Sequence, residues 1–105
     1  MNDRILGMVG LSVRAKRAST GVFLTEKALD EGTCELVIMA GDIGQSNKRK
    51  IESKCKEWDV PVIIYADKAT LSHAAGKKDM PVIGILDHGF AEAIAKLKNN
   101  GGADK

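Results

Sequence analysis

Aromatic side chains are scarce in this 105-residue chain: they make up 4% of it, as one Trp, one Tyr and two Phe. The core must therefore be built from Leu, Ile, Val and Ala, and a chain of this length has room for one such core in one domain. The excess of one sign of charge is also small, because 16 Lys and Arg residues face 14 Asp and Glu residues and the formal net charge is +2. That small sum favours no particular partner, so the placement of the charges matters more.

Cysteine is rare as well, and Cys34 and Cys55 form no CxxC pair. They lack the ligand spacing of a structural zinc site, and we expect two reduced thiols that are at least partly buried. The N-terminus has no basic region followed by an apolar core, so we expect no signal peptide. No apolar run approaches the ~20 residues that span a bilayer. We therefore expect a cytoplasmic protein.

The chain does contain three continuous apolar runs, and an aspartate follows each of them. The runs are 36–40, 61–65 and 81–86. Apolar runs without alternation predict strands that are covered on both faces, and amphipathic stretches between them predict helices. The fold class is therefore α/β, with helices on both sides of a sheet. In such folds the loops that leave the strand ends are the usual place for a ligand.

Five helices are predicted around these strands from apolar spacing and end signals. Their predicted limits are Asn2 or Asp3 to about Arg14, a cap at Ser19 or Thr20 to Gly32, a start at Ser46, Asp67 to Gly76, and a start at Asp87. The residues predicted to face the core are Ile51, Cys55 and Trp58 in the third helix and Phe90, Ile94 and Leu97 in the last. We expect one domain over 1–98 and a flexible tail over 99–105.

No catalytic constellation is evident. Asp42, Asp67 and Asp87 follow strands, where carboxylates hold Mg²⁺ or accept a phosphoryl group in some proteins. Asp67 and Asp87 are also well placed to cap the next helix, which leaves Asp42 alone as a poor metal site. His73 and His88 are not at ligand spacing from each other. We therefore expect no enzyme activity, no metal and no cofactor.

Lys48, Arg49 and Lys50 form the basic cluster that most needs an explanation. We predict them in the first turn of the third helix, where positive charge opposes the helix dipole. One interpretation is a solvated surface that Glu52 and Glu57 partly compensate. The other is contact with an anionic partner that carries several phosphates, and such binding depends on salt.

Phe23 is the second unusual feature. On a helical wheel it falls outside the apolar arc and next to Lys27, four residues further on. The predicted arc comprises Val22, Leu24, Thr25, Ala28 and Leu29. An aromatic ring beside a cation at a helix start can stack on a base while the helix start holds phosphate. The alternative is that the ring packs under an adjacent loop.

Several segments in a fixed order resemble a known family. They are Gly21-(five residues)-Lys27-Ala28-Leu29, then 36–42, Val60-Pro61-Val62 and 71–76. This order resembles the kink-turn-binding ribosomal proteins, the archaeal large-subunit protein seven-Ae and its thirty-e-like relatives. The segments 46–51 and 86–91 are similar to the small bacterial YlxQ-like branch.

The resemblance implies a three-layer α/β/α sandwich around a mixed four-stranded sheet, with the fourth strand near Ala18-Ser19. It also implies RNA binding in connection with ribosomes or their assembly. Together with the features above, it gives an expected RNA-binding surface. That surface comprises Arg17, Ser19, Thr20, Gly21, Phe23, Leu24, Lys27, Asp42, Ile43, Lys48, Arg49, Gly76, Lys77 and Lys78.

Several features depart from the family pattern. Ser19 and Thr20 stand where basic residues usually precede the glycine, and the loop from Lys77 to Met80 is shorter. Two further departures concern the reading of bases. The kink-turn binders typically carry Asn and Glu at the second and third positions after the glycine, where this chain has Phe23 and Leu24. Direct reading of base edges is lost there, and our hypothesis is that stacking on Phe23 replaces it. We expect a monomer that recognises structured RNA by backbone and shape. The second hypothesis is a protein–protein adaptor anchored by Phe23 and Leu24.

Overall fold

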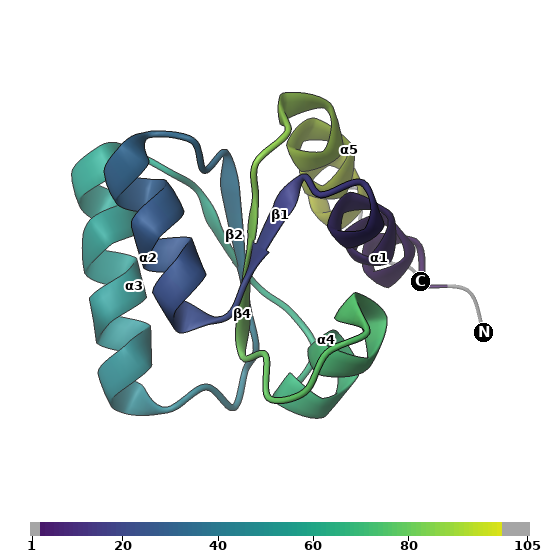
Figure 1. Cartoon of the computed structure of the whole chain (residues 1–105), viewed down its shortest axis with the longest axis horizontal. Helices are drawn as coiled ribbons and strands as arrows, with labels where there is room; N and C mark the ends of the chain where they lie inside the picture. Colours follow the sequence, from purple (N-terminus) through teal and green to yellow (C-terminus); the bar gives the residue numbers. More distant parts are fainter. Residues whose placement is uncertain (1–2, 100–105) are drawn as a thin grey trace.

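The computed structural model describes residues 3–99, which fold into alternating helices and strands (Figure 1). The elements are α1 (Arg4–Arg14), β1 (Ala18–Thr20), α2 (Val22–Glu31), β2 (Leu36–Met39), α3 (Gln45–Trp58), β3 (Val62–Ile64), α4 (Lys68–Ala75), β4 (Val82–Ile85) and α5 (His88–Asn99). The predicted tail lies outside the described residues, apart from Asn99 at the end of α5. Within 3–99, no helix combines the length and apolarity needed to cross a membrane.

The sheet is mixed and four-stranded, in the order β1-β4-β2-β3. β2 and β3 are parallel, whereas β4 runs antiparallel to both of its neighbours. β1 is the short strand that the family resemblance implied, and its register runs from Ala18 opposite Ile85 to Thr20 opposite Ile83. β1, β2 and β3 therefore finish where β4 begins. We call this the Gly21 end of the sheet, and the other the Arg17 end.

Helices cover both faces of the sheet, which confirms the three-layer α/β/α prediction (Figure 1). Leu36, Ile38 and Ala40 pack into the cluster formed with α1, α4 and α5. Val37 and Met39 belong to the cluster formed with α2 and α3. This alternation follows from the two-residue period of a strand. All residues of β2 and β4 are buried, as predicted for strands covered on both faces.

The prediction of a strand that is covered on both faces is wrong for β3. Its three residues are only partly buried, and the Ile64 side chain is 48% exposed. β3 stands at the border of the sheet, so one flank has no neighbouring strand. The composition of an apolar run does not reveal this position in the strand order.

Aspartates cap three helices, and two of these caps were predicted outright. Asp67 accepts a hydrogen bond from the Thr70 N–H at 2.8 Å, and Asp87 accepts one from the Phe90 N–H at 3.0 Å. Hydrogen bonding from Thr70 lowers the pKa of the exposed Asp67 carboxyl. Asp3 caps α1 in the same way. The predicted helix end at Gly32 is also confirmed, because Gly32 has the left-handed conformation at φ 75°.

The predicted serine and threonine caps are wrong. Ser19 and Thr20 belong to β1, and α2 begins after Gly21. The third helix begins one residue before Ser46, with Gly44 as its N-cap. Glycine has no side chain to offer the exposed N–H groups of a first turn, so α2 and α3 both begin without a side-chain cap.

Some predicted core residues lie at the surface. Leu24 is 45% exposed and Trp58 is 47% exposed, contrary to both predictions. The buried arc of α2 is narrower than the apolar arc of its sequence, and Trp58 is the last residue of α3. Phe90 and Leu97 are only partly buried, whereas Ile94 is fully buried as predicted. The buried residues of α2 are Thr25, Ala28 and Leu29.

Both cysteines are free and buried, as expected. Burial raises the pKa of the Cys34 thiol to about 11 and that of Cys55 to about 12. The thiols are therefore protonated at neutral pH and belong to the core between the sheet and the pair α2 and α3.

Candidate nucleic-acid interface

Backbone hydrogen bonds join the loops at the Gly21 end of the sheet. The Gly21 N–H donates to the Val82 carbonyl at 2.9 Å, and the Ala40 N–H donates to the Pro81 carbonyl at 2.8 Å. The segments that leave β1 and β2 therefore both border the segment that enters β4. This arrangement places the starts of α2 and α3 at one end of the molecule (Figure 1).

Asp42 lies in the loop after β2 and holds the start of α4. Its Oδ1 accepts a hydrogen bond of 2.8 Å from the Lys68 N–H. The next side chain, Ile43, is only 9% exposed and packs into the core under α2 and α3. The prediction that Ile43 lines the surface is therefore wrong for its side chain, because this position anchors the loop to the core.

The aspartates that follow the strands do not form a metal site. Asp42, Asp67 and Asp87 each accept a hydrogen bond from a helical N–H. Asp87 follows the antiparallel β4 and therefore lies at the Arg17 end, away from the other two. No group of three or more His, Cys, Asp or Glu side chains in residues 3–99 is arranged to hold a metal ion.

The backbone conformation at position 21 requires a glycine. Its φ is +94°, a region that L side chains rarely adopt. A Cβ at this position would also lie 3.4 Å from the Sδ atom of Met80. The absence of a side chain thus lets the loop before β4 lie close against the start of α2.

Ser19 is not a surface residue, contrary to prediction. Its side chain is 7% exposed, and its Oγ lies 3.3 Å from the Thr25 Oγ1, at hydrogen-bond distance. The Ser19 side chain points from β1 toward α2. Side chains alternate between the two faces of a strand, and that of Ser19 lies on the face covered by α2 and α3. Thr20, the next residue, is half-buried beside Gly21.

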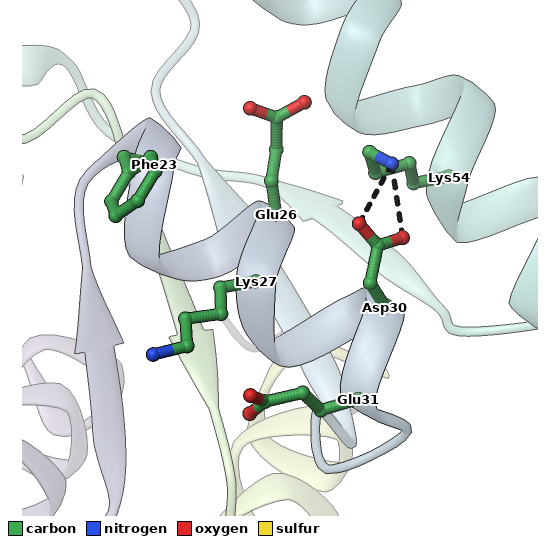
Figure 2. A pocket seen from close by; sticks show the side chains of 6 residues that line it. All are labelled: Phe23, Glu26, Lys27, Asp30, Glu31 and Lys54. Carbon is green, nitrogen blue, oxygen red and sulfur yellow. Dashed lines mark hydrogen bonds and ion pairs between the residues drawn. The ribbon is translucent and has the colours of Figure 1, made fainter.

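Phe23 is the most exposed large apolar side chain of the described residues, at 76%. The alternative that its ring packs under a loop is therefore excluded. Leu24 and Lys27 are exposed as well, so the first turns of α2 present two apolar side chains and a cation. Figure 2 shows the ring at the start of α2, away from the ion pair of Lys54 and Asp30.

Acidic side chains lie further along the outer face of α2. Glu26, Asp30 and Glu31 line a shallow pocket there together with Phe23 and the two lysines of Figure 2. Lys54 bridges to Asp30 at 2.9 Å, and this hydrogen bond raises the pKa of Lys54. The outer face of α2 therefore does not favour a polyanion. Among the described residues of α2, the start of the helix with Lys27 favours a polyanion, as do the adjoining loops.

Basic side chains gather around the same end of the sheet. Lys48 ends the first turn of α3, and Arg49 and Lys50 lie in the second turn, one turn later than predicted. Lys77 and Lys78 are exposed in the loop after Gly76, the left-handed C-cap of α4 at φ 68°. In the described part of the chain, none of these cations is among the groups that pair with a carboxylate within 4.0 Å.

The structure does not bring Arg17 to this surface. It precedes β1, and its carbonyl accepts a hydrogen bond of 2.8 Å from the Leu86 N–H at the Arg17 end. With Arg14 and Lys16 it forms a second basic region, separated from Gly21 by the length of β1.

Three residues of the Gly21 end were missed from the sequence. Met80 contacts Gly21, Lys68 donates to Asp42, and Ser72 bonds to the N–H of Met80. The available signal was the position of Ser72 next to Leu71 in a helix with a small apolar face, since a polar group that is buried there needs a partner.

Comparison with known proteins identifies the family. Residues 3–99 match the Ribosomal protein L7Ae/L30e/S12e/Gadd45 family. The chain belongs to this family. It is 29% identical over 95 residues to the RNA-binding protein YlxQ of Enterococcus faecium, covering 90% of this chain and 91% of that protein. It is 28% identical over 90 residues to the RNA-binding protein YlxQ of Bacillus subtilis, covering 86% and 90%.

Two solved structures share the fold of this chain. A protein with unknown function from Bacillus halodurans has 34% identity and a TM-score of 0.88, covering 93% of this chain and 99% of that one. The Giardia lamblia 15.5kD RNA binding protein has 21% identity and a TM-score of 0.72, covering 95% and 89%. This second likeness concerns the fold alone. The names of the family and of its relatives point to RNA-binding proteins, not to enzymes.

Proposed function

We propose that this protein is a noncatalytic RNA-binding protein of the cytoplasm, associated with ribosomes or their assembly. It acts as a monomer and recognises structured RNA at the Gly21 end of the sheet. The observation that carries the proposal is the composition of that end. Two helices without side-chain caps begin there beside cations that pair with no carboxylate among residues 3–99. The two relatives named YlxQ are RNA-binding proteins by name, which supports the same conclusion.

The helix starts supply the first part of the phosphate contact. Neither α2 nor α3 has an acidic residue in its first turn or a side-chain hydrogen bond at its N-cap. The N–H groups of a first turn lack intrahelical acceptors and carry the positive end of the helix dipole. A phosphate at either start would accept these hydrogen bonds.

The cations supply the second part. Lys27, Lys48, Arg49, Lys77 and Lys78 flank the helix starts from three different segments of the chain. They add attraction that does not depend on the base sequence. Contacts that ignore the base sequence fit a chain with Phe23 and Leu24, in place of Asn and Glu, at the second and third positions after Gly21.

Phe23 supplies the base contact. Its ring is exposed in the first turn of α2, next to the helix N-terminus that would hold a phosphate. Stacking of an unpaired base on an aromatic ring tolerates any base, because every base has a π-face. The proposed RNA is therefore a folded one with at least one base outside the stack.

Titration with a kink-turn RNA and with a matched duplex that lacks the bulge tests this function. We expect a slope of log K against log salt of about −2 to −3, corresponding to roughly three neutralised phosphates. A slope near zero contradicts phosphate recognition. Equal affinities for the two RNAs contradict recognition of a kink-turn and leave a general affinity for RNA.

One observation favours a second function, that of a protein–protein adaptor. Leu24 is 45% exposed beside Phe23, so the start of α2 presents two adjacent apolar side chains to a partner. Pull-down from cells after nuclease treatment separates the two functions. Partners that remain after RNA is removed, and that are lost with Leu24→Ser, favour the adaptor.

A further inference from the structure

Ser72 connects α4 to the end of the loop that follows it. Its hydroxyl donates a hydrogen bond of 2.6 Å to the Lys68 carbonyl and accepts one of 2.8 Å from the Met80 N–H. The residue is 7% exposed. A buried hydroxyl that both donates and accepts is satisfied on both sides, so the position of Met80 relative to α4 is well defined.

Met80 in turn reaches the start of α2. Its Sδ lies 3.4 Å from the point where Gly21 would carry a Cβ, and its side chain is half-buried. The loop and the helix start therefore meet where the thioether of Met80 lies against Gly21. The side chain of Met80 thus connects the loop that carries Lys77 and Lys78 to the start of α2.

Lys68 continues the connection to the loop after β2. Its N–H donates to Asp42, and its carbonyl accepts from Ser72. Its Nζ also lies 3.7 Å from Asp79 in the loop before Met80. The first turn of α4 thus contacts the loop after β2 and the loop before β4. Met80 connects the second of these loops to the start of α2.

We propose that Ser72 is a positioning residue for RNA binding: through Met80 it sets the spacing between the Lys77–Lys78 loop and the start of α2. This rests on the proposed function, because the spacing matters only if one polyanion contacts both segments. A loop that is already held in place has less conformational entropy to lose when it binds. Ser72 itself touches no RNA.

Ser12 offers a matched control. It is also a buried serine on a helix, is 0% exposed, and donates a hydrogen bond of 2.7 Å to the Val9 carbonyl. Within residues 3–99 its hydroxyl bonds inside α1 and to no loop. Ser12→Ala therefore reports what the loss of a buried serine hydroxyl does to stability alone.

The experiment compares Ser72→Ala with Ser12→Ala by amide hydrogen exchange and by RNA titration. In Ser72→Ala we expect exchange of the Met80 N–H to be faster by about tenfold, because the N–H loses its acceptor. We expect RNA affinity to fall by about fivefold or more. Ser12→Ala leaves both quantities at the wild-type value even if it lowers the melting temperature.

Met80→Ala provides the second variant, should Ser72→Ala fail to fold. It removes the contact with Gly21 and is expected to weaken RNA binding to a similar degree. The double variant is expected to bind no more weakly than the weaker single variant, because both substitutions break one connection. Additive losses overturn the proposal.

The role of Ser72 and the proposed RNA-binding function are contradicted by different results. Wild-type Met80 exchange in Ser72→Ala, or RNA affinity equal to that of Ser12→Ala, overturns the role of Ser72 alone. A wild-type protein that binds no RNA at all overturns the proposed function and this role with it.

Discussion

The Tyr65 hydroxyl donates a hydrogen bond of 2.5 Å to Oδ2 of Asp3, whose Oδ1 accepts from the Leu6 N–H at the start of α1. One carboxylate thus caps α1 and also holds the residue that follows β3. Burial, followed by this hydrogen bond, raises the pKa of Tyr65 to about 12 from its usual 10. The contact joins two layers of the fold, because α1 packs on the face of the sheet that Tyr65 borders.

Tyr65→Phe removes this contact while keeping the ring. We expect the free energy of unfolding at neutral pH to fall by about 1 kcal/mol. Because the folded pKa lies above the unfolded one, the native state holds its proton longer, and stability falls as pH rises from 10 to 12. Urea denaturation at a series of alkaline pH values measures this. The variant is expected to lose less stability in that window, and parallel curves for the two proteins contradict the assignment.

Gly84 in β4 is the most closely surrounded of the glycines in residues 3–99. A Cβ there would lie 2.6 Å from the Ser19 Oγ and 3.1 Å from the Cys34 Sγ. Gly84→Ala is expected to reduce the free energy of unfolding by about 2 kcal/mol or more, because a buried strand cannot yield to relieve the overlap. Gly7→Ala is the control, since a Cβ in the middle of α1 meets nothing within 4 Å. It is expected to add about 0.5–1 kcal/mol, and equal effects of the two variants would contradict the packing described.

Gly21 and Gly32 flank α2 and both have positive φ, at +94° and +75°. Gly21→Ala and Gly32→Ala are each expected to cost about 1 kcal/mol or more of stability. Only Gly21→Ala acts at the start of α2, where the new methyl group would contact Met80, so only it is expected to weaken RNA binding. Chemical denaturation and RNA titration of both variants provide the comparison. RNA affinities that fall alike would show that the site does not depend on the start of α2.

Phe23→Ala tests base stacking. Because the ring is 76% exposed, its removal is expected to change the free energy of unfolding by less than about 0.5 kcal/mol. RNA affinity is expected to fall by roughly 5- to 100-fold, the usual range for one stacked base. Trp58→Ala is the control, because it removes another exposed aromatic ring at the far end of α3. RNA affinity that stays at the wild-type value in Phe23→Ala would rule out stacking.

Local sequence signals predicted the elements that depend on local chemistry. The continuous apolar runs identified β2 and β4, and the aspartates at 67 and 87 identified two helix starts. β1 gave no such signal, because it is three residues long and exists through its pairing with β4, about 65 residues away in sequence. Its presence was implied only by the family resemblance.

The candidate site was predictable only where it depends on local sequence signals. The exposure of Phe23 followed from the helical period, whereas the exposure of Leu24 did not, because it depends on how much of α2 the sheet covers. The contacts of Asp42 with Lys68 and of Met80 with Gly21 join segments far apart in the chain. Such pairs follow from the topology of the sheet and carry no periodic signature.

Mapping of backbone amide chemical shifts during titration with a structured RNA is the most direct test of the central claim. The claim is that the end of the sheet at Gly21 is the RNA-binding surface. We predict that the largest shifts lie at 21–24, 41–48 and 76–80, with none at Arg17, Glu35 and His88. Shifts that instead centre on Arg17 and its basic neighbours, at the opposite end of the sheet, would contradict the claim.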